Sequence, residues 1–219
     1  MINFKSWLLS EEFFPQNGKA TVYHRTWKGR LSPYGILSSG FNVSGFKNKA
    51  KVGKGLYTVV NIEDQFHADM EPYGDTIIKF VVSDLDKYLI LGTFGGDPTM
   101  RLAQAVHGEN FSIEKQLQKF GLTDKVKLPK EQHRQSQADT FFSLNPWIDD
   151  SKLIKGIIYS DGHGFVLVKY DPIMDDSIKI LAYTKAAWDD MDKLEQLKKN
   201  KGWITSTEMA SFKSIQSIP

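Results

Sequence analysis

The sequence contains no cysteine among its 219 residues. This absence excludes a disulfide framework, a thiolate zinc site, an iron–sulfur centre and a cysteine nucleophile. A strong excess of one charge is also lacking, because 28 basic residues stand against 26 acidic ones. A net charge of +2 gives no reason by itself to expect a nucleic-acid binder. The ordinary composition, with 41% hydrophobic and 25% charged residues, excludes a disordered or fibrous chain.

Long apolar runs are missing as well. The most apolar window, residues 153–170, is interrupted by Lys155, Asp161, His163 and Lys169, so we expect no segment that spans a bilayer. The opening MINFKSWLLSEEFF holds too short an apolar stretch for the core of a signal peptide. These observations predict a cytoplasmic protein without a membrane partner, in the style of a bacterial or phage intracellular protein, and we expect a monomer.

Alternating apolar residues predict strands at seven places: ATVYHRT, GLYTVV, TIIKFVV, KYLIL, LIKGIIYS, FVLVKY and IKILAY. Helical spacing predicts helices over 61–70, 99–107, 112–120 and 186–199, the first with Asn61 as its N-cap. Strands and helices do not alternate regularly along the chain. This order indicates an α+β fold with a mainly antiparallel or split sheet.

The predicted domain organisation is a single domain over residues 1–219. Its core covers about 20–92 and 153–184, and a helical tail covers 186–219. The segment 93–150 contains the polar run KVKLPKEQHRQSQ, which has no apolar periodicity. We therefore interpret this segment as a mostly helical insertion or lid between two halves of one sheet.

Several common catalytic and binding motifs are absent. The Gly-Lys-Gly at 53–55 leads into a strand rather than out of one, which excludes a dinucleotide fingerprint and a P-loop. There is no H-E-x-x-H or G-x-S-x-G motif, and the histidines lack metal-ligand spacing, so no metal is expected. Paired aspartates at 149–150, 175–176 and 189–190 are interpreted as turns or helix starts.

Three short motifs combine polar side chains and glycines with predicted strands. VYHRT places His24 on a strand, and KVGKGLYTV places Tyr57 on a strand after a flexible, cationic Gly-Lys-Gly. YSDGHGFVLVKYD carries Asp161 and His163 among glycines near the start of a strand. Together these motifs resemble the ADP-ribosyltransferase fold of the diphtheria-toxin and poly(ADP-ribose) polymerase class. That family has a Tyr-His-Gly-Thr strand, a later Gly-Lys-Gly-Ile-Tyr strand, and an acidic residue that opens a further strand.

The resemblance covers a little under half of the chain. It implies a split antiparallel sheet with flanking helices, and it implies that NAD is the substrate. By resemblance, His24 would hydrogen-bond the adenosine-side ribose, and the backbone of Arg25 would hold the nicotinamide amide. Tyr57 would stack on the nicotinamide ring, as its flat and rigid face allows. The activity implied is transfer of ADP-ribose from NAD to an unidentified acceptor, either protein or nucleic acid.

Further NAD-binding residues follow from the same resemblance. Phe66 is the candidate for a second aromatic wall, Lys54 and Arg30 would face the pyrophosphate, and two glycines would let the backbone approach the ligand closely. The complete NAD-binding set expected is Tyr23, His24, Arg25, Thr26, Arg30, Gly53, Lys54, Gly55, Tyr57 and Phe66.

Two departures from the family pattern bear on activity. Arg25 replaces the family's glycine, which would put a long cation at the mouth of the pocket. The family's glutamate is missing, since no Glu occurs between Glu131 and Glu195. Asp161 is the candidate for the negative charge beside the nicotinamide ribose, with His163 orienting a hydroxyl, although an Asp-Gly turn explains the same residues.

The missing glutamate favours transfer of single ADP-ribose units over polymer formation. Two alternatives stay open at this point. The first is an inactive module of the same fold that binds NAD, ADP-ribose or a macromolecule. The second is another transferase on the same fold, such as an RNA 2′-phosphotransferase, which would require a more basic pocket.

Overall fold

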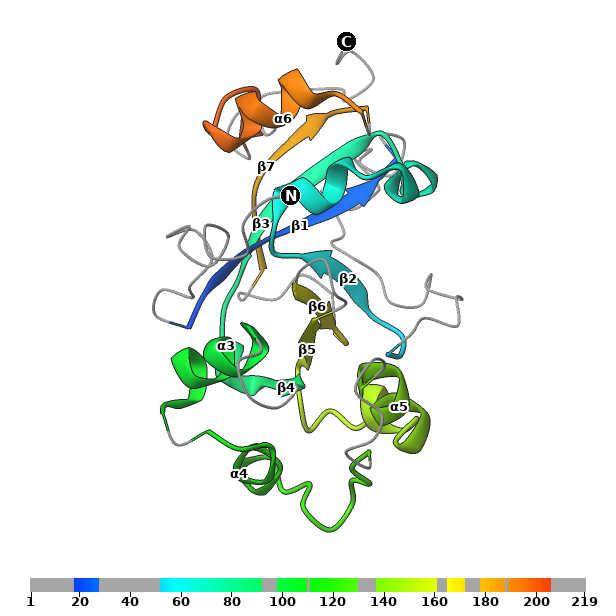
Figure 1. The fold of residues 1–219 in the computed structure, drawn as a ribbon, viewed down its shortest axis with the longest axis vertical. Helices are drawn as coiled ribbons and strands as arrows, with labels where there is room; N and C mark the ends of the chain where they lie inside the picture. Colours follow the sequence, from blue (N-terminus) through cyan, green and yellow to red (C-terminus); the bar gives the residue numbers. More distant parts are fainter. Residues whose placement is uncertain are drawn as a thin grey trace.

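The computed structural model describes residues 18–27, 52–91, 98–109, 111–129, 137–160, 165–171, 178–187 and 189–205. These residues form an α+β structure with helices packed around one mixed sheet (Figure 1). In this part of the chain the sheet has eight strands, in the order β4 (Tyr88–Leu91), β5 (Gly156–Ser160), β6 (Phe165–Lys169), β2 (Leu56–Val59), β1 (Ala20–Thr26), β3 (Thr76–Val82), β7 (Ile178–Lys185) and β8 (Ile204–Thr205). None of the helices in the described part of the chain is both long and apolar enough to cross a membrane.

All seven predicted strands are present, and the α+β class is confirmed. The sheet is mixed because β4 and β5 run parallel, whereas the other neighbouring strands run antiparallel. Strand β8 was not predicted, because two residues are too short to show a period of two.

The segment between β4 and β5 is a crossover connection. Parallel neighbours cannot be joined by a tight hairpin, so the chain must leave the sheet and return to the same edge. It does so through α3 (Pro98–His107), α4 (Ile113–Lys119) and α5 (Gln137–Leu144). The segment interpreted from the sequence as an insertion therefore joins two adjacent strands at one edge of the sheet.

The helix predicted over 61–70 is wrong in type. The structure has two 3-10 helices there, η3 (Ile62–Phe66) and η4 (Ala68–Tyr73), separated by the extended backbone of His67. Pro72 lies inside η4 and has no backbone N–H for an α-helical bond. The predicted N-cap is confirmed, because the Asn61 side chain accepts the backbone N–H two residues later at 3.1 Å.

The tail helix begins later than predicted. Helix α6 covers Met191–Lys198 rather than 186–199. Ala186 instead extends the pairing of β7 with β3, since its N–H donates to the carbonyl of Asp75 at 2.9 Å. Asp190 caps α6 by accepting an N–H of the first turn at 2.9 Å, which agrees with its interpretation as a helix start.

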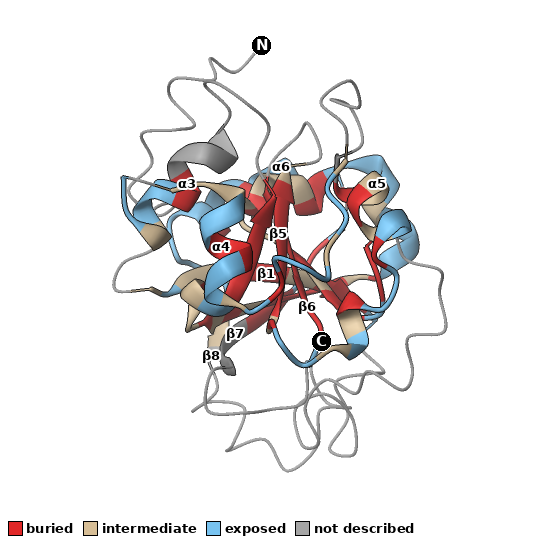
Figure 2. Ribbon diagram, turned by 90° about the horizontal axis from the view of Figure 1, so that it is seen from below, coloured by how far each residue is buried: buried red, intermediate tan, exposed pale blue. Residues whose placement is uncertain are grey.

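The two faces of the sheet pack against different helices, and Figure 2 shows the strands as the buried centre. The first core, under α3, contains Val22, Ile78, Phe80, Ile90, Leu102 and Leu167. The second core, under α4 and α5, contains Leu89, Leu117, Phe141, Ile148, Ile157 and Val168. The third core, under η3 and α6, contains Tyr23, Ile62, Phe66, Ile77, Leu194 and Leu197. Because neighbouring residues of one strand alternate between cores, the second and third cores share the face opposite the first.

Helix α4 covers the edge strand β4. The side-chain amide of Gln116 donates to the carbonyl of Ile90 at 3.0 Å and accepts its N–H at 2.9 Å. Gln116 is only 2% exposed, so this pair of bonds is shielded from water. The edge is thereby closed to pairing with another strand.

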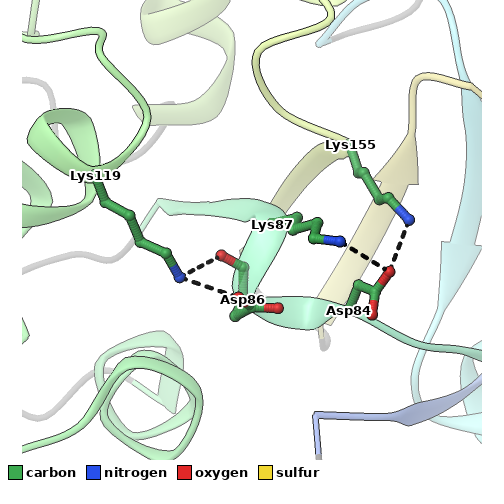
Figure 3. Close-up of polar contacts among 5 residues, drawn as sticks. All are labelled: Asp84, Asp86, Lys87, Lys119 and Lys155. Atoms are coloured by element: carbon green, nitrogen blue, oxygen red, sulfur yellow. Dashed lines mark hydrogen bonds and ion pairs between the residues drawn. The ribbon is translucent and has the colours of Figure 1, made fainter.

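Ion pairs link the same corner of the fold (Figure 3). Asp84, before β4, accepts from Lys155 at 2.8 Å and from Lys87 at 3.4 Å. Asp86 accepts from Lys119 of α4 at 3.1 Å. These side chains are partly exposed, and exposed pairs contribute at most about 1 kcal/mol each. The network therefore orients α4 and β5 more than it stabilises the fold.

Candidate functional site

The two central strands separate next to the motif residues. β1 pairs with β3 along its whole length, but its register with β2 consists of the pair Tyr23 and Val59. Beyond that pair, Nδ1 of His24 lies 2.9 Å from the carbonyl oxygen of Tyr57. A carbonyl only accepts, so the neutral His24 ring carries its hydrogen on Nδ1 and presents Nε2 as an acceptor. The structure thus brings the two motifs, 33 residues apart in sequence, together through the Tyr57 backbone. The Tyr57 ring itself packs beside the second core, on the face opposite the His24 side chain.

The Tyr57 phenol is fixed by its own loop. Its hydroxyl donates to the carbonyl of Gly53 at 3.0 Å and accepts the N–H of Val52 at 2.9 Å. Burial raises the pKa of Tyr57 to about 12, against the opposing effect of the Val52 bond and with smaller contributions from the charges of Asp139 and Asp149. The phenol is therefore neutral at physiological pH, and its ring packs beside the second core.

The glycines of the Gly-Lys-Gly loop are explained by neighbouring protein atoms. Gly53 has a φ of +100°, and a Cβ there would lie 2.9 Å from the Cβ of Asp149. A Cβ on Gly55 would lie 2.6 Å from the backbone oxygen of Lys169. Between them, the side chain of Lys54 is exposed, while its N–H donates to Asp149 at 2.9 Å. Close approach to a ligand by this loop stays a prediction.

The expectation of a cation at the pocket mouth is wrong. Arg25 is 4% exposed, and its guanidinium donates to the carbonyls of Gly74 at 2.5 Å, Ala186 at 3.0 Å and Gln65. Alternation along β1 sends this side chain to the face opposite His24. Burial lowers the pKa of Arg25 from its ordinary value, and nearby carboxylates oppose that shift. Arg25 is a buried tie between segments, and a ligand role for its backbone stays a prediction.

Thr26 is buried near His24 on the same face of β1. It is 1% exposed, and its hydroxyl oxygen has no hydrogen-bond partner in the structure. Buried polar groups without partners are uncommon in native proteins, so such a group needs an explanation. The protein encloses this hydroxyl, so it does not by itself indicate a ligand site.

Two other expected residues lie in the third core. Tyr23 stacks on Trp203 with their ring centroids 6.2 Å apart. Phe66 is 8% exposed and packs with Ile62 and the buried face of α6. Tyr57 contacts the second core instead, so the structure does not gather Phe66 and Tyr57 in one cluster.

Arg30, Asp161 and His163 lie outside the described residues. Of the hairpin that carries Asp161 and His163, the structure describes the two flanks, where Ser160 pairs with Phe165. Strand β6 itself has the sequence FVLVK and carries no carboxylate. Within the described part of the chain, no three histidine or acidic side chains gather into a group that could hold a metal ion.

Asp149 is the site residue that sequence reasoning missed. It was interpreted as part of a turn or a helix start, and it lies within the 3-10 helix η6 (Ile148–Asp150). The structure places its carboxylate against the Gly53–Lys54 backbone. No local signal could have revealed this contact, because 95 residues separate Asp149 from Lys54.

Comparisons with protein-family models, curated protein sequences and solved structures found no significant match to this chain.

Proposed function

We propose that this protein is an NAD-dependent mono-ADP-ribosyltransferase. The observation that carries the proposal is the contact between His24 Nδ1 and the Tyr57 carbonyl, where β1 and β2 separate. It joins the two motifs on which the family resemblance depends.

The proposed reaction breaks the bond between the nicotinamide nitrogen and C1′ of its ribose. Nicotinamide leaves with the bonding electrons, a nucleophile of the acceptor bonds to C1′, and the acceptor loses a proton. In this scheme Nε2 of His24 accepts from a ribose hydroxyl, and the neutral Tyr57 ring stacks on nicotinamide. Holding both ends of the dinucleotide lowers the entropic part of the barrier.

A non-catalytic module is the second candidate, and the missing carboxylate favours it. Strand β6, next to Tyr57, has no acidic residue, and Asp161 would have to supply the charge that stabilises an oxocarbenium-like state. Without that charge the same pocket would bind NAD or ADP-ribose but would not turn it over. Asp161→Ala separates the two: in a transferase it should lower kcat much more than NAD affinity.

The test is nicotinamide release from NAD by the purified protein, with and without cell lysate as a source of acceptor. A transferase should release nicotinamide, faster with lysate, and His24→Ala and Tyr57→Ala should abolish release while both variants stay folded. NAD binding by calorimetry without release would select the module. If neither binding nor release is seen, or if both variants keep full activity, the proposed function is wrong.

A further inference from the structure

One peptide unit of the Gly-Lys-Gly loop is held from both sides. The C=O of Gly53 and the N–H of Lys54 belong to the same planar peptide. That carbonyl accepts the Tyr57 hydroxyl at 3.0 Å, and that N–H donates to the Asp149 carboxylate at 2.9 Å. The orientation of the Tyr57 phenol and the position of Asp149 are therefore linked through a rigid group of atoms.

The two bonds strengthen each other. A carboxylate that accepts from an N–H makes a charge-assisted bond and polarises the peptide, so the carbonyl at the other end becomes a better acceptor. The Val52 N–H donates to the same phenol at 2.9 Å, and the Val52 carbonyl accepts the hydroxyl of buried Tyr170 at 2.8 Å. The Tyr57 hydroxyl thus belongs to a short hydrogen-bond network that ends at the Asp149 carboxylate.

Asp149 is itself fixed by the crossover segment. The preceding Ile148 is fully buried in the second core. Asn145 is also fully buried, and its side chain bonds both backbone groups of Lys127 at 2.8 Å and the carbonyl of Phe141 at 2.7 Å. This packing leaves the Asp149 backbone little freedom to follow a moving loop.

Gly53 shows that the fit between loop and carboxylate is tight. Its φ is positive, and a side-chain carbon at this position would lie 2.9 Å from the Asp149 Cβ, so there is no space for a side chain. In this arrangement the Lys54 N–H is satisfied by the Asp149 carboxylate. The Tyr57 hydroxyl donates to the Gly53 carbonyl of the same peptide, so the position of this peptide also determines the orientation of the phenol.

We propose that Asp149 is a positioning residue, which orients Tyr57 for stacking on nicotinamide through the Gly53–Lys54 peptide. This inference rests on the proposed function. It assigns the crossover segment between β4 and β5 a direct part in the site, because Asp149 of that segment bonds the loop that holds the Tyr57 hydroxyl.

Three variants and a control test the proposal. Asp149→Ala removes both the acceptor and the charge, Asp149→Asn keeps an oxygen acceptor without the charge, and Tyr57→Phe breaks the other side of the peptide. Asp150→Ala, at the exposed neighbouring position, is the matched control. The urea midpoint of each variant shows whether it folds, and Asp149→Asn keeps the test available if Asp149→Ala does not.

The first measurement needs no NAD. Amide hydrogen exchange should rise about tenfold or more at Lys54 in Asp149→Ala and in Tyr57→Phe, as expected for losing a bond in a shared network. Asp149→Asn and Asp150→Ala should stay near wild type. Unchanged exchange in Asp149→Ala would overturn the proposal.

The second measurement is NAD affinity by calorimetry, with kcat and KM for nicotinamide release. Asp149→Ala should weaken NAD binding about tenfold, and Asp149→Asn should recover most of that loss, since a hydrogen bond to an amide oxygen restores the loop. An Asn variant that loses as much affinity as the Ala variant would overturn the positioning role, because restoring an oxygen acceptor at position 149 would then not restore the loop. Wild-type protein that fails to bind NAD would refute the proposed function, whereas wild-type binding with an unaffected Asp149→Ala would refute only this inference.

Discussion

Replacement of Arg25 by methionine should strongly destabilise the protein. The guanidinium is the donor for three backbone carbonyls, those of Gln65, Gly74 and Ala186, and all three residues are buried. Methionine fills a similar volume without any donor. The carbonyls would then lie in the interior without the partners that the guanidinium supplies.

The size of the effect follows from two opposing contributions. Each buried carbonyl left without a partner costs about 1–3 kcal/mol, so three cost roughly 3–9 kcal/mol. Removing a buried cation recovers part of its desolvation penalty, which is several kcal/mol. We therefore expect a net loss of about 3 kcal/mol in the free energy of unfolding. With a typical urea slope of about 2 kcal/mol/M, the midpoint should fall by roughly 1.5 M.

Urea unfolding followed by tryptophan fluorescence measures this loss. Arg25→Lys should lose nearly as much, because one ammonium group cannot reach three divergent carbonyls as the planar guanidinium does. Lys185→Met, which removes an exposed cation on β7, should stay within about 0.5 kcal/mol of wild type. An Arg25→Met protein within about 1 kcal/mol of wild type would refute the view that this side chain ties the three segments together.

Three further predictions concern single contacts. Gln116→Ala should cost about 2 kcal/mol and speed amide exchange at Ile90, and unchanged exchange there would contradict the sealing of the edge. Burial alone would raise the pKa of Glu63, but contact with Lys198 lowers it below 4.5. The contact therefore stabilises the fold above pH 4.5, and this contribution is lost as the pH falls through the lower folded pKa. Glu63→Gln should flatten the acid side of the profile of stability against pH. The pKa of Tyr57 is raised from 10.0 to about 12. The free energy of unfolding of the wild type should therefore fall by about 1.4 kcal/mol per pH unit between these values, relative to Tyr57→Phe. Parallel profiles of stability against pH for the two proteins in this range would contradict the buried phenol.

Local signals predicted the elements well. Alternation of apolar residues is a property of a few consecutive residues, and it located the strand of His24 and the strand of Tyr57. Side-chain caps act over two or three residues, so Asn61 was recognised as a helix start. Asp190 was interpreted as a turn or a helix start, and it caps α6. The type of the helix after Asn61 was missed, because a proline and an extended His67 interrupt a pattern that is typical of an α-helix.

The candidate site was predictable only in part. The sequence supplied the residues His24, Thr26 and Tyr57, and the resemblance of their motifs to the ADP-ribosyltransferase family implied NAD. The sequence could not predict where the Arg25 side chain points, because that depends on which backbone carbonyls, distant in sequence, lie within reach of β1. The resemblance suggested a cation at the mouth of the pocket, whereas bonds to carbonyls at η3, η4 and the end of β7 make Arg25 a buried link between these segments.

By itself, the sequence determined the α+β class, the strands and the pair of motifs that the proposed function uses, because each depends on the chemistry of neighbouring residues. Only the tertiary structure decided the strand order, the parallel pairing of β4 with β5, and the contact of Asp149 with the Lys54 N–H. The physical reason is that a hydrogen-bonding group takes whichever partner the packing brings within reach. For Asp149 that partner lies 95 residues away.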